Sequence, residues 1–305
     1  MQVIRRILNG FALLLTLTAA TALAQTPERK QVEILGQKIY YTEAGSASNP
    51  SRPTVILLHG LGGDASNWAF TIPALAKNYR VLAPDQIGFG QSDKPLLNYR
   101  IGTYVEFLER FYQKLGITKA TLVGNSLGGW ISTAFTLAHP DKVEKLVLVD
   151  AAGFSPKRWN GPEMRREELA LLNPATIADT KKVMSLIFAN KQMVTDQLAE
   201  QMLMQRMKKG DGYTINQITE GILLGADFLD GKLGAIKTPT LVVWGREDGL
   251  TPLAMGKAFA EDIKGAELVV FENCGHVPQM ECAPKFNEAL NKFLSKAVAS
   301  SASAK

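Results

Sequence analysis

Short apolar runs alternate with longer segments of helical periodicity along most of this chain, and this alternation restricts the fold more than any other feature. Strands that helices bury on both faces have this Val-, Leu- and Ile-rich composition. A hairpin that turns near Gly36 predicts an antiparallel edge, and the alternation predicts a mostly parallel eight-stranded sheet flanked by helices, an α/β fold. The eight runs are QVEILG, QKIYYTEAG, TVILLHG, YRVLAPD, KATLVGN, KLVLVDA, TPTLVVWG and AELVVFE.

The segments between these runs have the spacing of helices, as in residues 67–78, 101–116 and 127–140. The alternation stops over residues 154–232, where helical segments follow one another without a clear strand. We therefore expect a core made of residues 25–153 and 233–305, with a helical insertion after the sixth strand. The total of 305 residues suits one large domain with such an insertion.

The first 24 residues are distinct from the rest. A basic start, MQVIRR, precedes an apolar stretch that ends at Ala22-Leu23-Ala24, and polar residues follow from Gln25. This pattern is typical of a cleaved secretory signal peptide and predicts a periplasmic or secreted protein. The alternative is an uncleaved anchor, but the stretch is short and rich in threonine for a membrane span. We therefore expect no stable membrane anchor.

The net charge bears on possible nucleic-acid binding, and the two cysteines bear on disulfide formation. The net charge of +5 falls to +3 once residues 1–24 are removed, because Arg5 and Arg6 are lost with them. This small and evenly spread excess does not indicate a nucleic-acid-binding protein. Cys274 and Cys282 could pair in an oxidising compartment, although their spacing equally allows two separate thiols.

A candidate nucleophile lies between a strand and a helix. Residues 124–128 read Gly-Asn-Ser-Leu-Gly, which matches the pattern G-x-S-x-G. In this context the pattern predicts a strained turn that exposes the serine hydroxyl above the sheet, at the positive end of the next helix. The strand–turn–helix setting makes an incidental match improbable. We take Ser126 as the nucleophile.

A serine nucleophile needs a base, and the chain has only three histidines, His59, His139 and His276. In sites of this design the order along the chain is serine, acid, histidine. Only His276 follows the last predicted strand, so His276 is the expected general base.

The base needs a carboxylate that holds its tautomer. Asp248, in the sequence WGREDGLTP, follows the seventh strand and is the expected acid, with Glu247 beside it. Asp150, at the end of the sixth strand, is the main competitor. Asp85 precedes the nucleophile in the chain and is expected to anchor a loop instead.

Two backbone N–H groups should stabilise the developing oxyanion. We expect these at Leu127, directly after the nucleophile, and at Leu61, in the sequence HGLGG. No phosphate-binding G-x-x-x-x-G-K-[ST] string occurs, and Cys274-Gly275-His276 supplies too few ligands for a zinc site. The expected chemistry therefore needs no metal and no organic cofactor.

These residues together resemble the α/β-hydrolase superfamily. The resemblance extends over nearly the whole chain after residue 24 and rests on HGLGGDASNW, PDQIGFGQSDKP, GNSLGGW, LVLVDAAGF, PTLVVWGREDGLTP and CGHVPQMECAP, in the family order. Haloalkane dehalogenases and epoxide hydrolases use an aspartate nucleophile, which Ser126 argues against. The resemblance implies that residues 154–232, called the cap segment below, cover the active site. It also places Leu61, Leu127, Phe154, Leu250 and Val277 near the acyl pocket.

Two groups within the superfamily look similar: secreted esterases and lipases related to the Moraxella and Psychrobacter lipases, and meta-cleavage-product hydrolases, which cut a C–C bond. The export signal and the apolar pocket residues favour a small-molecule ester or lipid as substrate. Arg206 would favour the C–C hydrolases if it bound a substrate carboxylate, but we expect it on the solvent face of its helix because Lys208 and Lys209 follow it. The sequence thus predicts a serine esterase or lipase, with a C–C hydrolase and a non-catalytic ligand-binding relative as alternatives.

Overall fold

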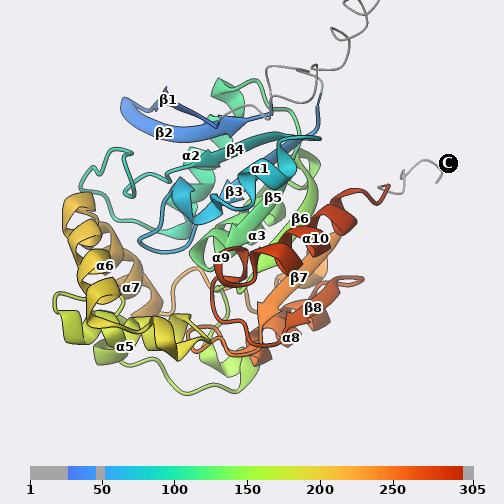
Figure 1. Cartoon of the computed structure of the whole chain (residues 1–305). Helices are drawn as coiled ribbons and strands as arrows, with labels where there is room; N and C mark the ends of the chain where they lie inside the picture. Colours follow the sequence, from blue (N-terminus) through green and yellow to red (C-terminus); the bar gives the residue numbers. More distant parts are fainter. Residues whose placement is uncertain (1–26, 46–51, 298–305) are drawn as a thin grey trace, which may run out of the picture.

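The computed structural model describes residues 27–45 and 52–297, and these contain the eight strands that the alternation predicts. They form one sheet in the order β1-β2-β4-β3-β5-β6-β7-β8 (Figure 1). Neighbouring strands from β4 to β8 in this order are parallel, whereas β2 is antiparallel to β1 and β4. The predicted fold class is therefore confirmed. The strands are β1 (Glu28–Ile34), β2 (Gln37–Ala44), β3 (Thr54–Leu58), β4 (Arg80–Pro84), β5 (Ala120–Asn125), β6 (Val143–Val149), β7 (Thr240–Gly245) and β8 (Glu267–Phe271).

The hairpin at the sheet edge turns where the sequence indicates. Ile34 pairs with Gln37, and the two residues between them, Leu35 and Gly36, have φ angles of 52° and 73°. A two-residue turn with both φ angles positive matches the right-handed twist of the flanking strands. This turn makes β1 the antiparallel edge strand.

Helices cover both faces of the sheet. In β3, Ile56 and Leu58 pack on the side of α2, α3 and α8, while Val55 and Leu57 pack on the side of α1 and α10. This two-residue period follows from the opposite directions of successive strand side chains. The α-helices are α1 (Ile72–Leu75), α2 (Ile101–Lys114), α3 (Leu127–Ala138), α4 (Arg166–Ala170), α5 (Ile177–Ile187), α6 (Asp196–Lys209), α7 (Gly212–Leu223), α8 (Leu253–Asp262), α9 (Pro278–Glu281) and α10 (Ala283–Leu294).

One expected helix is interrupted. Residues 67–78 have helical spacing, but the structure divides them between the 3-10 helix η2 (Ala65–Trp68) and the single-turn α1. Asp64 caps η2 by accepting a hydrogen bond from the backbone N–H of Ser66, and Pro73 lies at the start of α1. A proline lacks the N–H that a continuous helix would use there, so the two short helices start separately.

The cap segment contains α4 to α7 and lies between β6 and β7 in the chain. Figure 1 shows α5, α6 and α7 grouped at one end of the molecule, away from α10. The only regular elements among these described residues are α-helices and 3-10 helices. Its role as a separate domain with boundaries at 154 and 232 stays a prediction.

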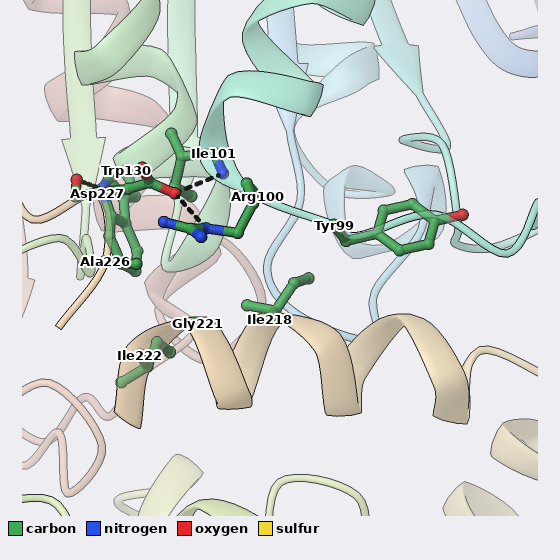
Figure 2. A pocket seen from close by; sticks show the side chains of 9 residues that line it. All are labelled: Tyr99, Arg100, Ile101, Trp130, Ile218, Gly221, Ile222, Ala226 and Asp227. Atoms are coloured by element: carbon green, nitrogen blue, oxygen red, sulfur yellow. Dashed lines mark hydrogen bonds and ion pairs between the residues drawn. The ribbon is translucent and has the colours of Figure 1, made fainter. Parts of the chain in front are cut away.

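The cap segment returns to the core through Asp227, which follows α7 (Figure 2). The Asp227 carboxylate accepts a hydrogen bond from Arg100 Nε at 2.9 Å, and its carbonyl accepts one from Trp130 Nε1 at 3.1 Å. Phe228 stacks on Trp130 with ring centroids 5.6 Å apart. The cavity between Arg100, Trp130, Asp227 and α7 is about 10 Å³, which leaves room for no more than a single water molecule. The contacts in Figure 2 therefore attach the end of the cap segment to α2 and α3 of the core and do not form a substrate site.

The predicted signal peptide, residues 1–24, lies outside the described residues. Across residues 27–45 and 52–297, every helix is too short or too polar to cross a membrane.

Candidate active site

The candidate catalytic residues meet at the carboxyl ends of the parallel strands. Ser126 directly follows β5, Asp248 lies shortly after β7, and His276 lies shortly after β8. In open α/β sheets this edge is where ligands bind, because the loops there converge from several strands. The structure thus brings together side chains that are 150 residues apart in the chain.

Ser126 occupies a strained turn. Its φ and ψ angles are 55° and −118°, a conformation that non-glycine residues seldom adopt. The flanking glycines make the turn possible: a Cβ on Gly124 would lie 2.2 Å from the Gly128 carbonyl oxygen, and one on Gly128 would lie 2.1 Å from that of Leu58. The turn places the Ser126 hydroxyl at the N-terminus of α3, where the helix dipole favours negative charge.

His276 is oriented by Asp248. The Nδ1 of His276 donates a hydrogen bond to Asp248 Oδ2 at 2.8 Å, and both side chains are buried. This bond leaves Nε2 as the unprotonated nitrogen, which is the form that a general base requires.

The side chain of Asn125 connects the histidine loop to the nucleophile turn. Asn125, the residue before Ser126, donates hydrogen bonds from Nδ2 to the carbonyls of Val149 and His276, both at 3.0 Å.

Within the described residues the Ser126 hydroxyl makes no hydrogen bond, so its contact with His276 is not formed in this conformation. Such contacts often tighten only when substrate binds. The roles of Ser126, His276 and Asp248 in catalysis stay predictions.

Asp248 is held as an anion by its surroundings. Its Oδ1 accepts hydrogen bonds from the backbone N–H groups of Leu250 at 2.8 Å and Thr251 at 3.0 Å, and Thr251 Oγ1 donates to Oδ2 at 2.6 Å. Burial alone would raise the pKa of Asp248, but the attraction of His276 and these hydrogen bonds lower it. The carboxylate is therefore poised to stabilise a protonated His276.

The loop with the sequence HGLGG passes directly over the nucleophile. A Cβ on Gly60 would lie 3.1 Å from the Ser126 Cβ, and Leu61 is half-buried beside it. His59 shapes this loop: its Nε2 accepts a hydrogen bond from the Gln86 N–H at 3.0 Å, and its Nδ1 donates to the Gly60 carbonyl at 2.8 Å. Burial lowers the pKa of His59, which keeps the ring neutral.

The second expected oxyanion donor is Leu127. It is the first residue of α3, so its N–H has no partner within the helix. Leu61 and Leu127 therefore lie on the two chain segments adjoining Ser126, and their function as donors stays a prediction.

The five expected pocket residues pack in different parts of the core, and their place around an acyl pocket stays a prediction. Leu61, Leu127 and Phe154 belong to the large apolar cluster on the α2–α3 side of the sheet, and Phe154 packs against Phe259 with ring centroids 4.4 Å apart. Val277 instead packs in a separate cluster with cap residues around Met184. Leu250 contributes the backbone hydrogen bond to Asp248 described above.

Arg206 differs from its expected position on the solvent face. Its side chain is only 17% exposed, and its Nη1 lies 2.6 Å from where a Cβ on Gly62 would be, against the loop over Ser126. Nε and Nη2 donate to Asn173 Oδ1 at 3.3 and 3.2 Å, and Nη2 lies 3.6 Å from the buried Asp211 carboxylate. The neighbouring lysines suggested exposure, but packing of α6 on the loop turns Arg206 inward, and Lys209 contacts the same loop through the Gly62 carbonyl at 3.1 Å.

The remaining sequence candidates have structural positions. Asp85 forms an ion pair with Arg29 and accepts hydrogen bonds from the backbone of Ala65 at 2.9 Å and Gln91 at 2.7 Å, so it anchors loops as expected. Cys274 and Cys282 form a disulfide on either side of His276, which resolves the pairing that the sequence left open.

Two supporting residues escaped the sequence analysis. Thr251 Oγ1 contacts both Asp248 and, at 3.2 Å, His276 Nδ1; its position three residues after Asp248 could have suggested a hydroxyl-capped turn. Glu281 accepts a hydrogen bond from the Gly275 N–H at 2.7 Å and from Asn190 at 3.0 Å. No local pattern indicates this second role, because its partners come from the histidine loop and the cap segment.

Comparison with known proteins agrees with this geometry. A model of the alpha/beta hydrolase fold family matches residues 53–283. The chain belongs to this family. It is a hydrolase of the α/β family, and the catalytic roles of Ser126, Asp248 and His276 within it stay predictions.

Three similar α/β hydrolases narrow the comparison. A 2-hydroxy-6-oxononadienedioate/2-hydroxy-6-oxononatrienedioate hydrolase from Klebsiella pneumoniae is 34% identical over 81% of this chain and 88% of its own. The structure of a meta-cleavage product hydrolase from Pseudomonas fluorescens is 30% identical, covers 87% of this chain and 97% of its own, and has a TM-score of 0.76. A bacterial membrane phospholipase A is 28% identical, covers 88% and 86%, and has a TM-score of 0.75.

These relatives correct the expected reaction. The sequence favoured cleavage of carboxylic esters, but curated relatives at 32–34% identity are named as hydrolases of 2-hydroxy-6-oxononadienedioate or of 2-hydroxymuconate semialdehyde. The esterase or lipase prediction is therefore wrong, and the alternative that the sequence left open has the better support. The sequence placed Arg206 on the solvent face of its helix, whereas its side chain is only 17% exposed.

Proposed function

We propose that this enzyme hydrolyses a C–C bond in a vinylogous 1,5-diketo acid of the 2-hydroxy-6-oxo-dienoate type. The triad geometry alone is common to ester and C–C hydrolases, so it does not select between them. The names of the relatives support the C–C reaction, and the inward position of Arg206 is the observation from this chain that carries it.

Arg206 is the cation that would bind the carboxylate of such a substrate. The guanidinium is largely buried and lies against Gly62. Its ion-pair partner is Asp211, at 3.6 Å. Asn173 Oδ1 receives hydrogen bonds from Nε and Nη2, which leaves Nη1 directed at the loop over Ser126. A planar guanidinium binds a carboxylate through two hydrogen bonds and confers direction as well as charge. An ester with an apolar acyl chain has no group for this cation.

The proposed reaction uses the same residues in sequence. Ser126 adds to the ketone carbonyl as His276 accepts its proton, and the N–H groups of Leu61 and Leu127 receive the oxyanion. The dienol must first ketonise, which moves its 2-hydroxyl proton to C5. When the C5–C6 bond then breaks, its electron pair delocalises onto the 2-oxo group of the keto acid that Arg206 would hold, and His276 returns its proton to the resulting dienolate. Water hydrolyses the acyl-enzyme, so the net reaction adds one water and yields a carboxylic acid and a shortened keto acid.

Steady-state kinetics with a 2-hydroxy-6-oxo-dienoate and with a p-nitrophenyl ester test this proposal. We expect the diketo acid to have the higher kcat/KM, and Ser126→Ala to lower kcat by roughly 10⁴–10⁶. Arg206→Ala should raise KM for the diketo acid by about tenfold or more, because a charged hydrogen bond contributes about 1.5–3 kcal/mol.

Lys208→Ala is the matched control, since Lys208 is an exposed cation on the same helix. It should leave both constants near wild type. The proposal is overturned if the wild-type enzyme prefers the ester, or if Arg206→Ala and Lys208→Ala have equal effects on the diketo acid.

A further inference from the structure

Asp150 is a buried carboxyl group that the proposed triad does not use. It directly follows β6, has a φ angle of 44°, and its side chain is fully buried. Oδ1 accepts a hydrogen bond from the Gly245 N–H at 2.9 Å, while Oδ2 has no donor partner among the described residues. A buried acidic oxygen without a donor is costly unless it carries a proton of its own.

The neighbour of Asp150 is the triad acid. One polar atom each from Asp150, Asp248 and His276 lies within 4.8 Å of the others, so the two carboxyl groups are direct neighbours in a buried cluster. Ionised carboxylates only accept hydrogen bonds, so two of them can share one only if one is protonated. Thr251 Oγ1 lies 3.1 Å from the Asp150 carbonyl and closes the same cluster.

The surroundings decide which of the two carboxyl groups holds the proton. Asp248 already accepts hydrogen bonds from Leu250, Thr251 and His276, which stabilise its anion. The titratable groups near Asp150 are Asp248, His276 and Glu281, and the two carboxyl groups among them disfavour a further negative charge on Asp150. Burial, followed by the charge of Asp248, raises the pKa of Asp150 well above its usual range.

We propose that Asp150 works as a neutral carboxylic acid that donates a hydrogen bond to Asp248 and so holds Asp248 in place against His276. Asp150 is then a positioning residue, because it touches neither the nucleophile nor substrate. The proposal rests on the triad assigned above but not on which bond the enzyme cleaves.

Asparagine reproduces the proposed form of Asp150. Its carbonyl can accept from Gly245, and its NH₂ can donate to Asp248, without a change in charge or in size. Alanine removes the donor and leaves a cavity. If Asp150 acts as a neutral donor, Asp150→Asn should therefore rescue what Asp150→Ala loses.

The first test measures the rate at which a fluorophosphonate labels Ser126, as a function of pH. We expect Asp150→Ala to reduce the rate by about tenfold to a hundredfold, since small misplacements of catalytic groups have effects of this size. Asp150→Asn should restore most of the rate, with the midpoint of the acid limb within about 0.3 pH units of wild type. An ionised Asp150 would instead stabilise protonated His276, so its loss in Asp150→Asn would lower that midpoint by about one unit or more. Such a shift, or equal rates for the two variants, overturns the proposal.

The second test reads the proton directly and needs no activity. An aspartate whose pKa is raised on folding stabilises the fold fully below its unfolded pKa of about 3.9, and this contribution is lost as the pH rises toward the folded pKa. We therefore compare the unfolding equilibrium constants of wild type and Asp150→Asn by urea denaturation between pH 5 and 8. The ratio of the wild-type constant to that of the variant should rise by up to about tenfold for each pH unit. A ratio independent of pH overturns the proposal even if Asp150→Ala does not fold. Failure of the proposed C–C reaction would appear separately, as labelling of Ser126 without cleavage of the diketo acid.

Discussion

The backbone N–H of His276 donates a hydrogen bond to the carbonyl of Ile187 at 2.7 Å, which joins the candidate general base to the end of α5 in the cap segment. A second such bond runs from the Gly249 N–H, beside Asp248, to the Leu186 carbonyl at 2.9 Å. The loops that carry the acid and the base are thus both tied to the same turn of the cap segment. We infer that this part of the cap positions the triad and that changes here alter activity without touching substrate.

Glu281 is the side chain that strengthens this connection, because it accepts hydrogen bonds from Gly275 at 2.7 Å and from Asn190 at 3.0 Å. Glu281→Gln replaces one acceptor oxygen by a donor that faces a backbone N–H. We expect a loss of about 1–3 kcal/mol in the free energy of unfolding and a lower kcat. Glu288→Gln, an exposed change on α10, should stay within about 0.5 kcal/mol of wild type in the same urea denaturation. Equal stabilities of the two variants would contradict this role.

The disulfide between Cys274 and Cys282 closes a short loop around His276. Reduction, or Cys274→Ser together with Cys282→Ser, should lower the free energy of unfolding by about 2 kcal/mol, because the unfolded chain regains loop entropy. Thiol alkylation followed by intact-mass analysis checks the pairing. Two alkylated cysteines in the native, unreduced and exported protein would show that the bridge does not form.

Asp248 and Asp150 should differ in their importance to turnover. Asp248→Asn would hold His276 in the wrong tautomer and lower kcat by up to roughly 10⁴, whereas Asp150→Asn should cost far less. Both variants should unfold cooperatively, as checked by circular dichroism alongside the kinetics. If Asp150→Asn lowered kcat more than Asp248→Asn, Asp150 at the end of β6 would be the triad acid instead.

Because His59 is buried in its neutral form, we expect the free energy of unfolding to fall as the pH is lowered. Burial lowers the pKa of His59 in the folded protein. Below the unfolded pKa of about 6.5, the unfolded chain therefore binds more protons at His59 than the folded protein does. The stability that neutral His59 contributes is complete above that pH and is lost as the pH falls, by up to about 1.4 kcal/mol per unit. His59→Gln should remove this part of the pH dependence in denaturation measured from pH 8 to 5. An unchanged slope would mean that His59 is not buried in its neutral form.

Export remains a prediction from the first 24 residues alone. Expressed with its natural start in a Gram-negative host, the protein should be found in the periplasm or medium and begin at Gln25. Cell fractionation followed by intact-mass analysis tests both points. A cytosolic protein that retains residues 1–24 would refute the predicted location.

The order of strands and helices could be predicted from the sequence because side-chain periodicity is a local property. The runs from Thr54 to Phe271 have the two-sided burial of a parallel sheet, and the context of Ser126 between strand and helix is a local pattern too. The chain positions of Asp248 and His276 after the last two strands then followed from the family order.

Contacts between distant segments were decided only by the tertiary structure. Local sequence placed Arg206 on the solvent face beside two lysines, but the packing of α6 against Gly62 turned it toward the nucleophile loop. The proximity of Asp150 to Asp248 depends on β6 and β7 lying side by side, and the bond from Ile187 to His276 depends on how the cap segment folds back. Burial and charge pairing arise from these long-range contacts, and no local pattern encodes them.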